Sequence, residues 1–222
     1  DDVIVSGVNY EPPTEEVIAY DDGIADDALV LVSAGNGCAV RFTPSQNGKL
    51  MGASIYLWDD DWPTPGGNRL GFEVYEVNDD GSISKFGETL YIDNLIRGDW
   101  NYIDLSNYDF FTDKDFFIST MQDTIGDYVP GTGLDTNSLH GNRAYLNVGG
   151  EMYPLADEGF EGVFMIRAHI DYTQTPSETG KVKTVKAISR NASKSVESNN
   201  KGIMNVFSKE LVKEVDPSFR IG

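Results

Sequence analysis

The sequence predicts an all-β protein that folds as an antiparallel two-sheet sandwich of the jelly-roll kind. Short runs rich in Val, Ile, Phe, Tyr and Thr recur along the chain, as they do in β-strands. Clusters of Gly, Asn, Asp and Pro separate these runs, and such clusters form turns. No helical periodicity interrupts the pattern before residue 174, which favours a sandwich over a fold with helical crossovers.

Eleven runs are candidate strands, and two of them show a clear alternation. In the last run, apolar residues occupy every second position from Phe164 to Tyr172, with Arg167 and His169 between them. Residues 70–77 alternate in the same way, which predicts that Glu73 lies on a solvated face. The eleven candidates are residues 3–8, 16–20, 29–33, 38–43, 50–58, 70–77, 90–92, 100–105, 115–121, 143–148 and 163–172.

The composition of the chain changes near residue 173. The polar segment 173–180 is typical of a linker between a jelly-roll-like domain at residues 1–174 and a basic C-terminal extension at residues 175–222. In the extension, residues 182–188 and 203–207 have strand-like composition and are separated by a turn-like segment, which predicts a small β-hairpin. The alternatives are a flexible tail or the start of a further domain.

The two parts also differ in charge. Residues 1–174 contain 8 Lys/Arg and 31 Asp/Glu, a net charge of −23, whereas residues 175–222 contain 9 Lys/Arg and 5 Asp/Glu, a net charge of +4. A body this acidic repels phosphate backbones, so we expect no nucleic-acid partner. The chain lacks the run of about 18 apolar residues that spans a bilayer, so we expect no membrane insertion.

The sequence contains no recognisable catalytic pattern. The chain has two histidines, His140 and His169, and a single cysteine, Cys38. It has no His-Glu-x-x-His motif and no Gly-x-Ser-x-Gly motif. Cys38 lies in an apolar run, which predicts a small buried hydrophobe rather than a nucleophile. We therefore expect no catalytic residue and no required cofactor.

An acidic loop is a candidate calcium site. Calcium binds several carboxylate and carbonyl oxygens held on a turn. Asp21, Asp22, Asp26 and Asp27 flank a short turn and are the candidate ligands. A second acidic loop runs from Asp59 to Asn68, and neither loop has EF-hand spacing. The alternative is that both loops are solvated turns without an ion.

The second loop is also a candidate ligand-binding surface. Its tryptophans lie beside carboxylates and an amide, and exposed aromatic rings next to such groups are typical of sugar-binding surfaces. The alternative is that a tryptophan folds over the sandwich edge and seals the core. The candidate residues are Tyr56, Trp58, Asp60, Asp61, Trp62 and Asn68. The long segment 123–142 is a further candidate for a functional loop, or for a cover over one end of the sandwich.

The order of several motifs resembles a known type of module. The motifs are EVIAYDDG at 16–23, GCAVRFTP at 37–44, GASIYLW at 52–58, DDWPTPGGN at 60–68, FEVY at 72–75, DWNYIDL at 99–105 and MIRA at 165–168. In this order they resemble the non-catalytic C-terminal β-domains of bacillopeptidase F-type secreted subtilases and related bacterial surface proteins. The resemblance covers about residues 16–172. It implies a galactose-binding-like sandwich at the cell surface or outside a bacterial cell, covalently linked to neighbouring domains.

Three functions remain open from the sequence. The first is an extracellular accessory or binding module that recognises a glycan or a protein. The second is an accessory fragment that supports or targets the catalytic domain of a secreted subtilisin-like protease. The third and most distant is a hydrolase that uses the carboxylate-rich loops.

Overall fold

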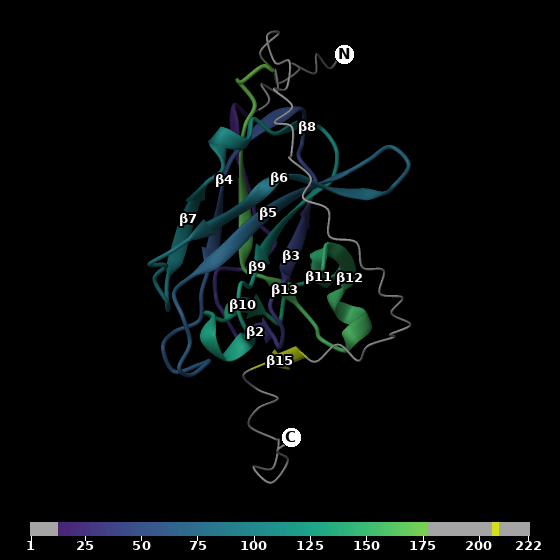
Figure 1. Ribbon diagram of the computed structural model, residues 1–222. Coiled ribbons are helices and arrows are strands. Elements are labelled where there is room, and N and C mark those ends of the chain that lie inside the picture. The colour runs from purple at the N-terminus through teal and green to yellow at the C-terminus, as the bar shows by residue number, and fades with distance from the viewer. Residues whose placement is uncertain (1–12, 177–205, 209–222) are drawn as a thin grey trace, which may run out of the picture.

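The computed structural model describes residues 13–176 and 206–208 (Figure 1). The predicted strands at residues 3–8 and 182–188 lie outside these residues. The prediction of an all-β sandwich is confirmed, since the described chain forms three antiparallel sheets joined by short 3-10 turns. The turns are η1 (Ser106–Tyr108), η2 (Gly126–Tyr128), η3 (Gly141–Arg143) and η4 (Leu155–Glu158).

Two large sheets form the layers of the sandwich. The five-stranded sheet has the order β1 (Glu15–Ile18), β14 (Ile166–Asp171), β4 (Gly48–Tyr56) and β7 (Trp100–Asp104), with β8 (Phe111–Thr112) also paired to β4. The six-stranded sheet has the order β12 (Glu151–Pro154), β11 (Ala144–Val148), β3 (Asn36–Phe42), β9 (Phe116–Met121), β5 (Leu70–Val77) and β6 (Ile83–Ile92). In Figure 1, β5 and β6 cross the front of the molecule with β4 behind them.

The strand order is that of a jelly roll. The chain passes from β3 in one sheet to β4 in the other, returns for β5 and β6, and crosses again for β7. As a result, β14 lies between β1 and β4, and β9 lies between β3 and β5, although these strands are far apart in sequence. Interleaving of early and late strands is what two nested Greek keys produce.

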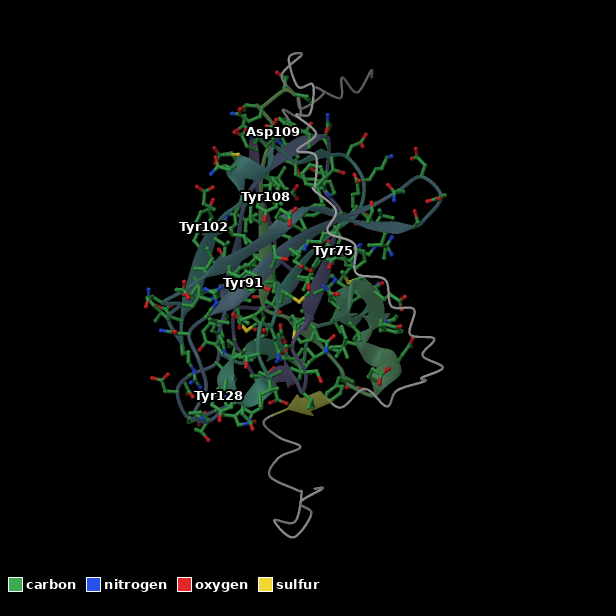
Figure 2. All side chains as sticks on the ribbon, in the orientation of Figure 1. Tyr75, Tyr91, Tyr102, Tyr108, Asp109 and Tyr128 are labelled. Carbon is green, nitrogen blue, oxygen red and sulfur yellow. The ribbon has the colours of Figure 1, made fainter. Side chains whose placement is uncertain are left out.

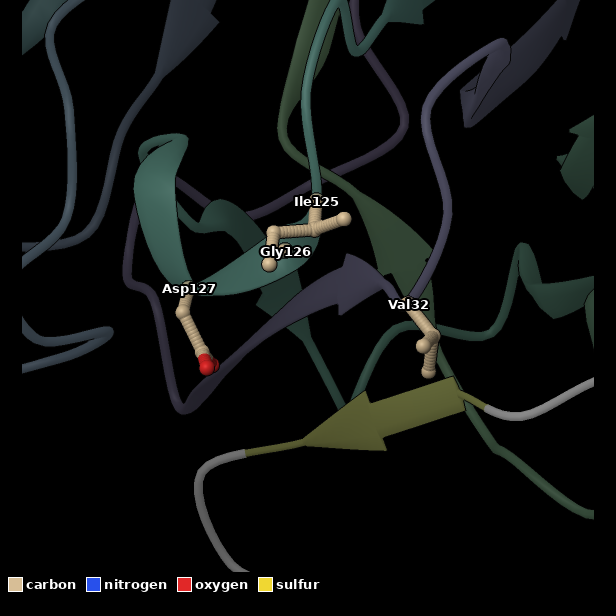
Figure 3. A pocket seen from close by; sticks show the side chains of 4 residues that line it. All are labelled: Val32, Ile125, Gly126 and Asp127. Atoms are coloured by element: carbon tan, nitrogen blue, oxygen red, sulfur yellow. The ribbon is translucent and has the colours of Figure 1, made fainter. Parts of the chain in front are cut away.

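A smaller four-stranded sheet closes one end of the sandwich. Its order is β13 (Val163–Phe164), β10 (Thr132–Asp135), β2 (Asp27–Leu31) and β15 (Val206–Ser208). β15 overlaps the strand predicted at 203–207, but it pairs with β2, and the predicted hairpin partner lies outside the described residues. A hollow of about 110 Å³ is lined by Val32, Ile125, Gly126 and Asp127, and Figure 3 shows these residues close to β15. The boundary between residues 174 and 175 stays a prediction.

The core lies between the two large sheets. The alternation predicted for the last strand is confirmed, because Ile166, Ala168 and Ile170 are buried, whereas Arg167 and His169 are only half-buried. The largest fully buried side chains are aromatic or branched, which suits the pleated inner faces of a sandwich. They include Phe42, Phe72, Phe110, Phe116, Phe164, Leu50 and Ile55, whereas Phe117 packs with Ala39 and Tyr75 on the outer face of the six-stranded sheet.

Several strands differ from the sequence prediction. β6 begins at Ile83 rather than at residue 90. Its first half was not predicted because β6 is an edge strand whose polar residues do not alternate regularly with apolar ones. The long segment 123–142 is not structureless, since it contains η2 and β10. The predicted run 163–172 is divided at Met165 into β13 and β14, which belong to different sheets. In the part of the chain that the structure describes, no helix is long and apolar enough to cross a membrane.

Candidate functional site

The outer face of the six-stranded sheet carries a hollow of about 480 Å³. Inward residues of β5 such as Phe72 and Val74 belong to the core, so Glu73 and Tyr75 point to the opposite face and line the hollow. Lys85, Thr89 and Tyr91 line it from the neighbouring edge strand β6. Figure 2 marks Tyr75 and Tyr91 on this sheet.

The carboxylate of Glu73 is the centre of a hydrogen-bond network on the floor of the hollow. Its Oε1 accepts hydrogen bonds from Lys85 Nζ and from Thr89 Oγ1, each at 2.6 Å. Its Oε2 accepts a hydrogen bond from the hydroxyl of Tyr75 and one from Asn147 Nδ2 at 3.3 Å. Asn147 Nδ2 also donates to Tyr75 Oη and to Ser119 Oγ, both at 3.0 Å.

This network joins strands that are not neighbours. Asn147 on β11 and Glu73 on β5 are separated by β3 and β9, a distance of roughly 14 Å in a flat sheet. The side chains meet because β3 contributes only small residues there: Gly37, which pairs with Asn147, and Ala39. The sheet therefore provides a recess in which polar groups from four strands converge.

Burial makes the network electrostatically tight. Glu73 is only 4% exposed, and Tyr75, Ser119 and Asn147 are also buried. Burial raises the pKa of Glu73, but the hydrogen bonds from Lys85, Thr89 and Tyr75 outweigh it, so the net pKa lies below its ordinary value. Burial and the neighbouring carboxylate raise the pKa of Tyr75. Glu73 is therefore an anion at neutral pH, paired with the Lys85 ammonium.

The rim of the hollow is bare backbone on one side. Gly35, Gly149 and Gly150 line it with φ values of +80°, +62° and +96°, a region that favours glycine. A Cβ added at any of the three would meet no atom within 4 Å, so open space lies beside them. Gly150 N donates to Asn147 Oδ1 at 2.9 Å, which ties the rim to the network below.

On the opposite side of the hollow, Tyr91 rests on a glycine. Gly71 pairs with Tyr91, and a Cβ at Gly71 would come within 2.9 Å of Tyr91 Cε1 and 2.7 Å of Thr89 Cγ2. The Arg69 guanidinium lies 4.8 Å from the centre of the Tyr91 ring. The missing side chain of Gly71 therefore lets the ring lie close to the sheet surface, where it is 40% exposed.

The predicted surface from Trp58 to Asn68 is an ordered loop. Trp58 Nε1 donates to Asp61 Oδ1 at 2.9 Å, and Trp62 is half-buried against the core. Arg97, which the sequence did not single out, donates from Nη2 to the carbonyls of Asp59 at 2.6 Å and Pro63 at 3.1 Å. The loop is therefore fastened to the body by a largely buried guanidinium.

The remaining members of this predicted surface point in different directions. Tyr56 packs edge-on against Trp100, with ring centres 5.8 Å apart. Asp60 is exposed and lies 3.4 Å from Arg97 Nε. Asn68 is exposed, and its carbonyl accepts a hydrogen bond from the amide of Leu95. A sugar-binding role for this surface stays a prediction.

The aspartates of the predicted calcium loop have partners within the protein. The Asp21 carboxylate is buried and lies 2.5 Å from Arg167 Nη2. Asp26 Oδ2 accepts hydrogen bonds from the amide and side chain of Thr136 and from Asn137 Nδ2.

The other two aspartates bond to nearby main-chain amides. Asp27 Oδ1 accepts from the amide of Ala28, and Asp22 Oδ1 accepts from the amide of Ile24. Over residues 13–176 and 206–208, no group of three or more His, Cys, Asp or Glu side chains is arranged to hold a metal ion. Calcium at Asp21, Asp22, Asp26 and Asp27 stays a prediction.

The histidines and the cysteine occupy ordinary structural positions. Cys38 is buried, as predicted, and burial raises the pKa of its thiol to about 12. His140 packs against the Tyr20 ring. His169 Nε2 lies 2.8 Å from Ser54 Oγ, a contact between a hydroxyl and a base. The His169 ring also contacts the Tyr102 ring, with ring centres 5.2 Å apart.

No local sequence motif marks the hollow. The alternation with Phe72 and Val74 places Glu73 on the outer face, but the prediction that it is solvated there is wrong, because Lys85, Thr89, Tyr75 and Asn147 surround its carboxylate. Asn147 lies in the same way between Leu146 and Val148. The sequence therefore indicates a polar residue between apolar ones on each of two strands. Only the strand register of the folded sheet shows that these two side chains meet.

These features define the class of protein: an all-β sandwich module with a polar recess on one outer face. The chain is similar to Bacillopeptidase F from Bacillus subtilis (strain 168), with 34% identity over 160 residues. The match covers 70% of this chain but 11% of the length of that protein, so it is confined to one region of it. The predicted resemblance to bacillopeptidase F is confirmed to this extent.

Other comparisons add less. No protein-family model matches the chain. Among solved structures, that of the infectious bursal disease virus Gx strain matches 71% of this chain and 36% of the viral chain, with 14% identity and a TM-score of 0.28.

Proposed function

We propose that this chain is a non-catalytic accessory module of a larger secreted or surface-displayed bacterial protein, and that it binds a glycan in the hollow above Glu73. The observation that carries the proposal is the Glu73–Lys85 ion pair on the floor of an open recess. The similarity to one short region of Bacillopeptidase F supports an accessory role within a longer chain.

The charges of the hollow favour a neutral, hydroxylated ligand. The carboxylate of Glu73 and the ammonium of Lys85 cancel, so neither a bare anion nor a bare cation is favoured. Lys85 Nζ donates to Glu73 and to Thr89, and its side chain is 34% exposed, so its third N–H would be available to a ligand hydroxyl. The surrounding protein has a net charge of −19 and repels anions. A sugar ring offers hydroxyls that both donate and accept hydrogen bonds.

The walls of the hollow also suit a sugar. The ring of Tyr91 provides an apolar surface of the kind against which a sugar ring stacks. The glycine rim exposes backbone groups without side chains that would keep a ligand away. The volume of about 480 Å³ lies within the roughly 300–1,000 Å³ usual for small-molecule sites.

A second candidate function rests on the same sequence match. If the parent protein is a subtilisin-like protease, the module would support or target its catalytic domain rather than act alone. The similarity to Bacillopeptidase F favours this candidate. The gene context decides it, because a parent without a protease domain would exclude this role.

The proposal is tested by screening the purified chain against an array of neutral glycans and then measuring the affinity of the best ligand by calorimetry. Tyr91→Ala is expected to weaken binding about tenfold, which converts to about 1.4 kcal/mol, because the variant removes the apolar ring on which the sugar would stack. Tyr153→Ala is the matched control, since Tyr153 is 37% exposed on the same sheet but does not line the hollow. Absence of binding to any glycan, or equal losses in both variants, would reject the glycan site.

A further inference from the structure

Three strands of the five-stranded sheet bring outward side chains together at one point. Val17 on β1 pairs with His169 on β14, and His169 pairs with Gly52 on β4. The register shifts directly after His169, so that Met51 is an additional residue on β4. A hollow of about 230 Å³ opens beside this irregularity. It lies on the opposite side of the sandwich from the Glu73 hollow.

A fixed aromatic ring forms one wall of this second hollow. Tyr102 projects from β7 and is 58% exposed (Figure 2). It lies over Gly52, where an added Cβ would come within 2.4 Å of the Tyr102 hydroxyl oxygen. The ring meets His169 edge-on, with centres 5.2 Å apart, and Ser54 holds His169 in place from below. The exposed face of Tyr102 is therefore oriented before any ligand arrives.

The rim of the hollow is acidic, and the nearby cations are engaged elsewhere. Glu15 and Asp171 pair across β1 and β14 and both line the hollow. Lys49 pairs with Asp171 from β4, but its ammonium lies 3.0 Å from Asp109.

The groups on β14 add no free positive charge to the hollow. Arg167 binds the buried carboxylate of Asp21 and stacks on Trp100 at 4.1 Å. Burial, and then the charge of Arg167, lower the pKa of His169, so this imidazole is neutral at neutral pH.

An apolar floor, an aromatic wall and a carboxylate rim together match one kind of group. The methylene stem of a lysine or arginine would pack on Val17 and Met51, and its cation would face the Tyr102 ring and the carboxylates. The volume is below the roughly 300 Å³ at which drug-sized sites begin, so it suits one side chain. We infer that this hollow binds a lysine or arginine side chain presented by a basic segment of a partner protein.

The charge of the whole molecule supports this partner. A net charge of −19 attracts basic segments from a distance and repels acidic ones. Long-range attraction alone would act over the entire surface. The Tyr102 hollow adds one defined position at which the attracted side chain would be held. Binding at this position differs from general attraction to the acidic surface.

The test uses the full chain, labelled with nitrogen-15, and the peptide acetyl-Gly-Lys-Gly-amide. Saturable shifts are expected at the amides of Val17, Tyr102 and His169. The same peptide with an Nε-acetylated lysine should bind at least tenfold more weakly, because acetylation removes the charge. Tyr102→Ala should weaken binding about fivefold, which converts to roughly 1 kcal/mol, whereas Tyr102→Phe should bind like the natural chain.

Tyr128→Ala is the matched control, because Tyr128 is 54% exposed and lies outside this hollow. If Tyr102→Ala fails to fold, Tyr102→Leu keeps the bulk of the side chain and still removes the aromatic face. Three results would each overturn the inference. The first is that the lysine peptide causes no saturable shift, and the second is that the acetylated peptide binds with equal affinity. The third is that the shifts are spread over the acidic surface and are unchanged in Tyr102→Leu. The result is independent of whether the Glu73 hollow binds a glycan.

Discussion

Replacement of Lys85 by methionine isolates the charge that neutralises Glu73. Methionine keeps most of the length and apolar volume of the lysine stem but removes the ammonium. Glu73, which is 4% exposed, would then keep the hydrogen bonds from Thr89, Tyr75 and Asn147 without a countercharge. The variant therefore measures the cost of a buried carboxylate that lacks its ion-pair partner.

The magnitude follows from the burial of the two partners. Removing one member of a fully buried ion pair costs about 3–5 kcal/mol, whereas an exposed pair contributes about 0–1 kcal/mol. Since the Lys85 side chain is 34% exposed, solvent screens part of the interaction. We expect Lys85→Met to lower the free energy of unfolding at pH 7 by about 2 kcal/mol, an intermediate value.

Urea unfolding of four proteins provides the assay: the natural chain, Lys85→Met, Glu73→Gln and the double variant. In the double variant the uncompensated charge is gone, so it should be more stable than Lys85→Met, with a coupling energy of about 1–2 kcal/mol. A loss below about 0.5 kcal/mol for Lys85→Met would refute the reasoning, because ordinary surface substitutions change stability by no more than this. Simple additivity in the double variant would also refute it, because it would show that the two side chains do not interact.

The pH dependence gives the sign of the same effect. The folded-state pKa of Glu73 is lowered, so its contribution to stability is present above the unfolded pKa, near 4.3, and is lost as the pH falls through the folded pKa. In Lys85→Met, protonation of Glu73 relieves the buried charge. The difference between this variant and the natural chain should therefore shrink from pH 7 to about pH 3.

Two further predictions concern the strands beneath the hollow. Because Cys38 is buried and its pKa is raised to about 12, it should resist thiol reagents in the folded protein and react only in urea; rapid labelling without denaturant would contradict its placement. Gly37→Ala should destabilise the fold by about 2 kcal/mol in urea unfolding, because the added Cβ would lie 1.8 Å from the carbonyl oxygen of Thr120. Unchanged stability of this variant would contradict the close approach of β3 to β9 at Gly37.

The strands with regular alternation were predictable from the sequence. The last strand was found because apolar residues alternate with polar ones in its sequence. This alternation matches the structure, where Ile166, Ala168 and Ile170 are buried and their neighbours are half-buried. β10 was missed because its four residues, Thr132 to Asp135, include a glycine and an aspartate, which are rare in strands. The strands β2 and β9 are also buried at every residue, but they were found because they are rich in Val, Leu, Ile and Phe.

The candidate sites were less predictable than the fold, for a physical reason. Composition pointed to Trp58 and Trp62, which lie near carboxylates in the sequence. The Glu73 hollow instead depends on a polar residue from each of several strands, among them Asn147 and Ser119. Their meeting depends on the register and on the small residues of β3. Such convergence is a property of the folded sheet and leaves no local motif.

The interleaved order of the sheets has a consequence for how the chain folds. β14, near the end of the described domain, occupies the place between β1 and β4, so the five-stranded sheet is incomplete until residue 171 is available. A chain that emerges from its N-terminus would hold β1 and β4 with unpaired edges, which are prone to aggregation. Pairing over such long sequence separations is slow, so we expect one late, cooperative step in which the arrival of β14 completes the module.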